Sequence, residues 1–149
     1  MPSGPEPLLG PTLARMSDLS VDAAIVKDVL KADPGSAWRW TNQNPRVKVW
    51  FQPGEPQSFY LRFTLAGVIL KKAGPLTIRM IVNDKPLDVL RFDKEQEYEY
   101  SRPVPASMLG AEDSAVVGLD IDPIYVSPGD AMKLGVLLEE IGLKPAGGQ

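Results

Sequence analysis

The chain has 149 residues, which suits one domain with a hydrophobic core of its own. It contains no cysteine and no histidine, which excludes disulfides, thiolate or imidazole metal sites, and catalysis by Cys or His. The net charge is −3 and the basic residues are dispersed, which argues against a nucleic-acid partner. No apolar run approaches the roughly 18–20 residues that a membrane span requires.

Proline and glycine dominate both ends of the chain. Six of the first eleven residues are proline or glycine, and the last five read Pro145-Ala-Gly-Gly-Gln149. We therefore predict a flexible tail over residues 1–20, a folded domain over residues 21–144 and a second flexible tail over residues 145–149. The first residues do not resemble a signal peptide, because Glu6 and several prolines precede any apolar stretch. The sequence itself therefore indicates no compartment.

Residues 20–33 admit two interpretations. Ser20 is suited to cap a helix that ends before Pro34. The apolar stretch over residues 24–30 is equally suited to a strand. We favour the strand.

Alternating apolar side chains predict three strands in the middle of the chain, over residues 47–51, 58–65 and 76–82. In the second of these, for example, Phe59, Leu61 and Phe63 alternate with polar or amphipathic residues. A period of two places each apolar set on one face of its strand. We therefore expect a sheet with one face in the core and the other in solvent.

Short strands continue through the second half of the chain. Asn83 and Asp84 tolerate the positive φ of a tight turn, so residues 85–92 should pair back on the preceding strand. Residues 95–100 place three glutamates on one face, which must be solvated, and residues 115–121 form a strand that stops at Asp122-Pro123. Residues 133–143 have leucines at helical spacing, but Gly135 and Val136 favour a strand, which we prefer.

The order of several short segments resembles a known group of domains. The segments are Ala37-Trp-Arg-Trp-Thr41, Gly74-Pro75, Val82-Asn83-Asp84, Arg102-Pro-Val-Pro105, Ser127-Pro-Gly-Asp130 and Lys133-Leu-Gly-Val136. Over roughly residues 25–143 they resemble galactose-binding-like jelly-roll domains, of carbohydrate-binding-module type, attached to bacterial glycosyltransferases and other polysaccharide-handling envelope proteins. The resemblance implies an all-β antiparallel sandwich of eight or nine strands without a catalytic role. It also implies a location in the cell envelope or outside the cytoplasm.

Outward-facing aromatic residues are the first candidates for a binding site. Trp50 and Tyr60 fall on the polar faces of their predicted strands, with Lys48 and Arg62 beside them. A flat aromatic ring can stack on a sugar ring while polar neighbours bind its hydroxyl groups. The alternative is that a loop, the N-terminal segment or a partner chain covers these rings.

A structural calcium ion is a weaker candidate. Asp120 and Asp122 share a strand face, and Asp130 follows a few residues later. Carboxylate oxygens at this spacing suit Ca²⁺, although aspartates next to proline and glycine also serve in turns. We expect no other cofactor.

Three functions remain open. The first is a non-catalytic accessory module that binds bacterial surface or envelope carbohydrate through Trp50, Tyr60, Arg62 and Lys48. The second is a structural or protein-interaction domain that docks on its parent protein or forms oligomers. The third is a hydrolase with paired carboxylates, for which Glu139 and Glu140 are adjacent but show no sign of desolvation.

Overall fold

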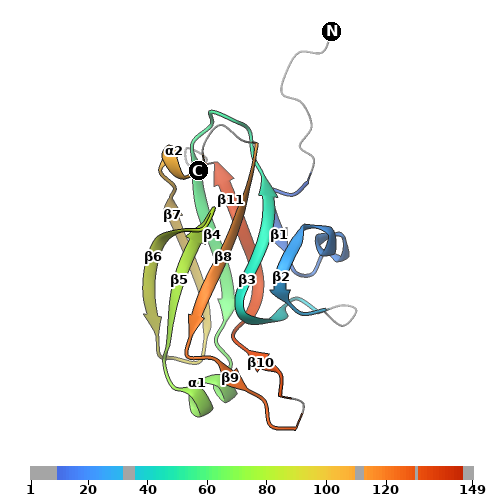
Figure 1. Ribbon diagram of the computed structural model, residues 1–149, viewed down its shortest axis with the longest axis vertical. Helices are drawn as coiled ribbons and strands as arrows, with labels where there is room; N and C mark the ends of the chain where they lie inside the picture. Colours follow the sequence, from blue (N-terminus) through green and yellow to red (C-terminus); the bar gives the residue numbers. More distant parts are fainter. Residues whose placement is uncertain (1–9, 32–35, 110–112, 130, 146–149) are drawn as a thin grey trace.

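The computed structural model describes residues 10–31, 36–109, 113–129 and 131–145, and within these ranges the chain forms eleven strands and three short helices. Figure 1 shows that the long strands run along the long axis of the molecule, with α1, β9 and β10 at one end and α2 at the other. All strand pairs are antiparallel. The all-β antiparallel class predicted from the sequence is confirmed.

The strands form two curled sheets. Sheet A has the order β1-β11-β4-β7, and its strands are β1 (Leu13–Arg15), β11 (Leu137–Pro145), β4 (Gln57–Thr64) and β7 (Glu97–Pro103). Sheet B has the order β6-β5-β8-β3-β2, and its strands are β6 (Lys85–Phe92), β5 (Leu76–Val82), β8 (Ser114–Asp122), β3 (Arg39–Trp50) and β2 (Ile25–Val29). The start of β3 also pairs with β11, which joins the sheets along one side.

The remaining elements lie in the connections. Strands β9 (Tyr125–Val126) and β10 (Lys133–Leu134) pair with each other and form a two-stranded ribbon. The helices are α1 (Gly67–Ala73), α2 (Ala106–Leu109) and a 3-10 helix over Leu19–Ala24. In the described ranges no helix is both long and apolar enough to cross a membrane.

The core lies between the inner faces of the two sheets. Alternate residues of β4, including Phe59, Leu61 and Phe63, are fully buried and face the buried residues of β5 and β8. The ring of Phe63 packs edge-on against Phe92 at 5.1 Å and stacks on Tyr98 at 5.4 Å, measured between ring centroids. This burial of alternate apolar residues is the physical basis of the pattern seen in the sequence.

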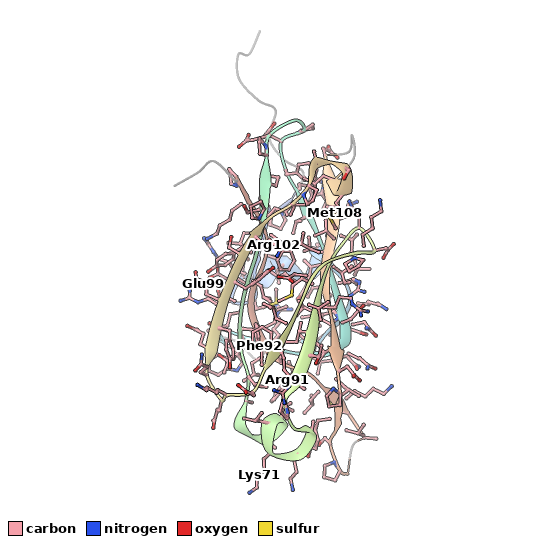
Figure 2. All side chains as sticks on the ribbon, turned by 90° about the vertical axis from the view of Figure 1, so that its left-hand side faces the viewer. Lys71, Arg91, Phe92, Glu99, Arg102 and Met108 are labelled. Carbon is pink, nitrogen blue, oxygen red and sulfur yellow. The ribbon has the colours of Figure 1, made fainter. Side chains whose placement is uncertain are left out.

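On the side of the sandwich opposite the pairing of β3 with β11, the carboxylate of Asp88 connects the two sheets through hydrogen bonds. Tyr100 on β7 donates a hydrogen bond of 2.6 Å to Oδ2 of Asp88 on β6, and Arg102 donates one of 3.2 Å to the same atom. Figure 2 looks onto this side, with Glu99 and Arg102 along β7, Arg91 and Phe92 on β6, and Lys71 and Met108 at the two ends. Asp88 therefore links the edge strands of the two sheets.

Several predictions of local structure are confirmed. The strands predicted over residues 76–82 and 85–92 are β5 and β6, joined by Asn83 and Asp84 with φ of 49° and 68°. The strand interpretation holds over Ile25–Val29 and Leu137–Pro145, although the 3-10 helix precedes the first of these.

The prediction of a flexible tail through residue 20 needs correction. Leu13–Arg15 forms β1 on the edge of sheet A, and the side chains of Ala14 and Met16 are fully buried. The buried Arg39 donates a hydrogen bond of 3.2 Å to the backbone oxygen of Met16. The folded part therefore begins before residue 21, because this segment completes the core. Residues 1–9 and 146–149 lie outside the described ranges.

Candidate functional site

The four residues predicted to bind carbohydrate lie on two different sheets. Lys48 and Trp50 lie on β3 in sheet B, whereas Tyr60 and Arg62 lie on β4 in sheet A. Strand alternation places all four opposite the fully buried residues of their strands, on the two outer faces of the sandwich, although the half-buried Trp50 also packs against the core cluster. The structure does not bring them together into one site.

The side chain of Tyr60 is enclosed on the outer face of sheet A. It is 5 % exposed, its hydroxyl donates a 2.5 Å hydrogen bond to Glu99, and the ammonium of Lys144 lies 3.7 Å from its ring centroid. Burial, together with the hydrogen bond and charge of Glu99, raises the pKa of Tyr60 to about 12. Lys144 thus occupies the ring face that a sugar would need.

Arg62 lies beside several carboxylates on the same face. It approaches Glu97 at 3.5 Å and Glu140 at 3.9 Å. An irregularity in the pairing of β11 between Leu138 and Glu140 places Glu139 and Glu140 side by side, and Thr64 donates a hydrogen bond of 2.9 Å to Glu139. Burial, and then the neighbouring Glu97, raises the pKa of the Glu139 carboxyl. This surface is therefore a network of internally paired charges.

The ring of Trp50 is partly covered by the N-terminal segment. A Cβ atom added to Gly10 would lie 2.3 Å from the indole, so Gly10 packs directly against it. The backbone N–H of Trp50 donates a 2.9 Å hydrogen bond to Pro11, and the Lys48 ammonium lies 5.2 Å from the ring centroid. Coverage by the N-terminal segment is the alternative that the sequence had left open for this ring.

A polar groove crosses the outer face of sheet B near the end that carries α1, β9 and β10. We call it the sheet B groove; its volume is about 330 Å³ and its lining residues are Gln43, Asn44, Thr77, Arg79, Val89, Asp120, Ile121 and Asp122. Strand register places Arg79 directly between Asp120 on β8 and Val89 on β6, and Asn44 on β3 continues the row. The groove thus spans four strands and presents amides, carboxylates and a guanidinium side by side.

Fixed hydrogen bonds hold the β3 side of the groove. Oδ1 of Asp120 accepts a 2.7 Å hydrogen bond from Arg46 and a 2.9 Å hydrogen bond from Asn44. Burial acts to raise the pKa of Asp120, but these hydrogen bonds and the charges of Arg46 and Arg79 outweigh it, so the pKa is lowered. Asp120 is therefore an ionised, rigidly placed acceptor.

A second hollow continues the groove past β3. Its volume is about 410 Å³, and it shares Gln43 and Asn44 with the sheet B groove. Its other lining residues are Asp28, Asn42, Ala131, Met132 and Lys133. The polar run Thr41-Asn-Gln-Asn-Pro45 supplies three of the lining residues, and the sequence analysis gave it no role because no motif marks it.

The predicted calcium ligands fall in different settings. Asp120 is engaged by Arg46, Asp122 lines the sheet B groove, and Asp130 lies outside the described residues. In the part of the chain that the structure describes, no three or more Asp or Glu side chains are grouped so that they could hold a metal ion. Oδ1 of Asp120 already accepts hydrogen bonds from Arg46 and Asn44, so a cation on that oxygen would have to replace them.

Comparison with known proteins shows which solved structures share this fold. No protein-family model and no curated protein matches the chain. Among solved structures, a family 35 carbohydrate-binding module from an environmental isolate is 12 % identical, with a TM-score of 0.55 over 91 % of this chain and 93 % of that chain. A family 35 module from Clostridium thermocellum is 8 % identical, with a TM-score of 0.52 over 92 % and 99 %.

One further solved structure is a much longer enzyme. BtGH115A, a family GH115 4-O-methyl-alpha-glucuronidase, matches with a TM-score of 0.52 and 8 % identity over 96 % of this chain but only 18 % of its own. Identities this low show similarity of fold and no more. Together with the antiparallel sheets, they show that this chain has the jelly-roll β-sandwich fold of carbohydrate-binding modules.

Proposed function

We propose that this chain is a non-catalytic accessory module that binds carbohydrate in the sheet B groove. The observation that carries the proposal is the row of Asn44, Asp120 and Arg79 across neighbouring strands of a carbohydrate-binding-module fold. The match to part of a longer enzyme supports an accessory role. The resemblance seen in the sequence supports a bacterial surface or envelope carbohydrate as the ligand.

The chemistry of the groove suits sugar hydroxyl groups. Each hydroxyl donates one hydrogen bond and accepts others, so it needs acceptors such as Asp122 and donors such as Arg79. No ion pair within the described ranges engages either of these two side chains. Val89, which is 45 % exposed, offers an apolar contact for the C–H face of a sugar ring.

The residues predicted from the sequence enter this proposal in two ways. Lys48 and Trp50 alternate with core residues along β3 and lie on the same outer face as Asn44, so a longer sugar chain would reach them. Tyr60 and Arg62 would form a separate site on sheet A. We place the first sugar unit in the groove because Tyr60 is buried and Arg62 is paired with carboxylates.

A glycan array followed by calorimetry tests the proposal. For a sugar that binds the wild-type chain, Arg79→Ala should weaken binding by about tenfold or more, because a hydrogen bond to a charged group is lost. Arg62→Ala is the matched control, since it removes an arginine from the opposite outer face, and it should leave the affinity unchanged. The reverse result would move the site to sheet A, and folded protein that binds no glycan would contradict the carbohydrate function.

The same experiments also test the two alternative functions, a protein-docking domain and a carboxylate hydrolase. A negative glycan array combined with self-association in light scattering would favour docking. Hydrolysis of a glycoside by the chain would favour catalysis by Glu139 and Glu97. That alternative has less support, because Glu97 is about half exposed and neither glutamate lines the hollows described above.

A further inference from the structure

A single row of residues crosses all five strands of sheet B, which lie side by side in Figure 1. Strand register places Val89 on β6 opposite Arg79 on β5, and Arg79 opposite Asp120 on β8. On β3, the side chain of Asn44 donates a 2.9 Å hydrogen bond to Asp120. The backbone N–H of Asn44 donates another, also of 2.9 Å, to Oδ2 of Asp28 on β2. Because neighbouring strands lie about 4.8 Å apart, the row extends over about 19 Å.

Two hollows open along this row and meet at β3. The sheet B groove, of about 330 Å³, includes the row from Val89 to Asn44. The hollow of about 410 Å³ includes Asn44 and Asp28, and we call it the β10-side hollow because Lys133 on β10 also lines it. One sugar ring spans little more than one strand spacing, so a single sugar unit would occupy only part of the row.

The β10-side hollow contains the same kinds of groups as the sheet B groove. Asn42 supplies an amide, Asp28 a carboxylate, and the exposed Lys133 a flexible side chain with three donors. No ion pair within the described ranges engages Asp28 or Lys133. Met132, which is 41 % exposed, adds an apolar surface, as Val89 does in the groove. Each hollow can therefore bind the hydroxyl groups and the C–H face of one sugar unit.

Opposite charges balance among the described lining residues of each hollow. In the sheet B groove the two aspartates are balanced by Arg79 and by Arg46, which pairs with Asp120 at 2.7 Å. In the β10-side hollow Lys133 balances Asp28. A charged ligand would therefore gain no net attraction from either hollow, whereas a neutral ligand can use the hydrogen-bonding groups of both.

We propose that the ligand is a neutral oligosaccharide of at least two units, with one unit in the sheet B groove, the next in the β10-side hollow and Asn44 at their junction. This inference rests on the function proposed above and adds the length and charge of the ligand. A second unit placed along β3 towards Lys48 would instead lie on Arg46, because alternate residues of a strand share a face. Hydrogen bonds to Asp120 and to the backbone oxygen of Leu119 hold Arg46 in that position.

Calorimetric titration of the full chain with neutral sugars of increasing length tests the proposal. The probes are monomers to tetramers of glucose, galactose, mannose and xylose, with oligomers of galacturonic acid as the charged comparison. In a series that binds, the dimer should bind about tenfold more tightly than the monomer, because the second unit adds hydrogen bonds. Raising the salt concentration should leave the affinity unchanged, since the ligand carries no charge.

The outcomes separate this inference from the proposed function. Equal affinity of monomer and dimer, or a preference for the charged series, would overturn the inference and leave carbohydrate binding in place. Folded protein that binds no member of any series would contradict the proposed function and the inference together.

Two lysine variants test where the second unit lies. Lys133→Met removes the ammonium from the β10-side hollow at an exposed position, so the dimer should lose about tenfold in affinity while the monomer, in the sheet B groove, should lose none. Lys94→Met is the matched control, because Lys94 is an exposed lysine in the turn between β6 and β7, and it should change neither affinity. An unchanged ratio of dimer to monomer affinity in Lys133→Met would overturn the placement of the second unit.

Discussion

At the scale of single residues, the outer face of sheet A shows how burial changes an aromatic side chain that sequence alone places in solvent. Tyr60 sits at an outward position of β4, yet Lys144 and Glu99 enclose it. The period of two gives the direction of a side chain, but it carries no information about residues from distant strands that fold over it. Tyr60 is therefore better suited to stability than to stacking.

The two tyrosines with raised pKa values should make the fold sensitive to alkali. The pKa of Tyr60 is about 12 because of burial and Glu99, and that of Tyr100 is about 12 because of burial and Asp88. Both lie above the ordinary value of 10, so the unfolded chain ionises first. The stabilisation that the two neutral tyrosines contribute is fully present below pH 10 and is lost as the pH rises towards 12.

Urea unfolding at pH 8 and pH 11.5 measures this effect. The wild type should lose about 2 kcal/mol per tyrosine between the two conditions, since one pKa unit corresponds to about 1.4 kcal/mol. Tyr60→Phe should remove about half of the loss, and Tyr100→Phe the other half. An unchanged pH dependence in both variants would refute the assignment.

At the scale of elements, the close approach of β3 and β8 depends on a glycine. A Cβ atom at Gly118 would lie 2.1 Å from the backbone oxygen of Pro45 and 2.7 Å from Cδ of Arg46. The missing side chain lets Arg46 lie across β8, where it donates a 2.7 Å hydrogen bond to Asp120. The geometry of the β3 side of the sheet B groove therefore requires a residue without a side chain at Gly118.

Gly118→Ala should destabilise the chain by about 3 kcal/mol, because the clash is with backbone and a neighbouring side chain. Gly54→Ala is a suitable comparison, since Gly54 has a φ of 83° but nothing lies within 4 Å of an added Cβ atom. That variant should lose only about 1 kcal/mol through backbone strain. Chemical unfolding of both would decide, and equal losses would contradict the steric argument.

Some strands could be predicted from the sequence and others could not. The hairpin of β5 and β6 was predicted because alternation and turn residues agree over Leu76–Phe92. Strand β1 was missed because prolines and glycines around it indicate a loop. It pairs with β11 at Gly142, where an added Cβ atom would lie 2.4 Å from the backbone oxygen of Thr12. Such a close approach has no local signature.

At the scale of the whole molecule, the two sheets are joined on one side by the pairing of β3 with β11 and on the other by Asp88. The carboxylate of Asp88 has a lowered pKa, chiefly because Tyr100 donates a hydrogen bond to it. Its contribution to stability is present above the ordinary carboxyl pKa and is lost as the pH falls through the lowered value. The closure of the sandwich should therefore weaken in acid.

Asp88→Asn should remove this part of the acid dependence. Thermal unfolding at pH 6 and pH 3 should show a smaller difference between the two conditions for the variant than for the wild type. Asp93→Asn is the control, because Asp93 is exposed and its ion pair with Arg91, at 4.0 Å, is solvated. If the Asp88 variant kept the full acid dependence, the link between β6 and β7 through Asp88 would not contribute to the pH dependence of stability.

The sequence by itself determined the all-β class, most strand positions and the absence of Cys and His chemistry, because these depend on composition and on the local period of two. The tertiary structure decided which outward residues share a face. It separated Trp50 from Tyr60 and brought Asn44, Arg79 and Asp120 together from three strands. Register and curvature set those distances, and both arise from contacts between residues far apart in the chain.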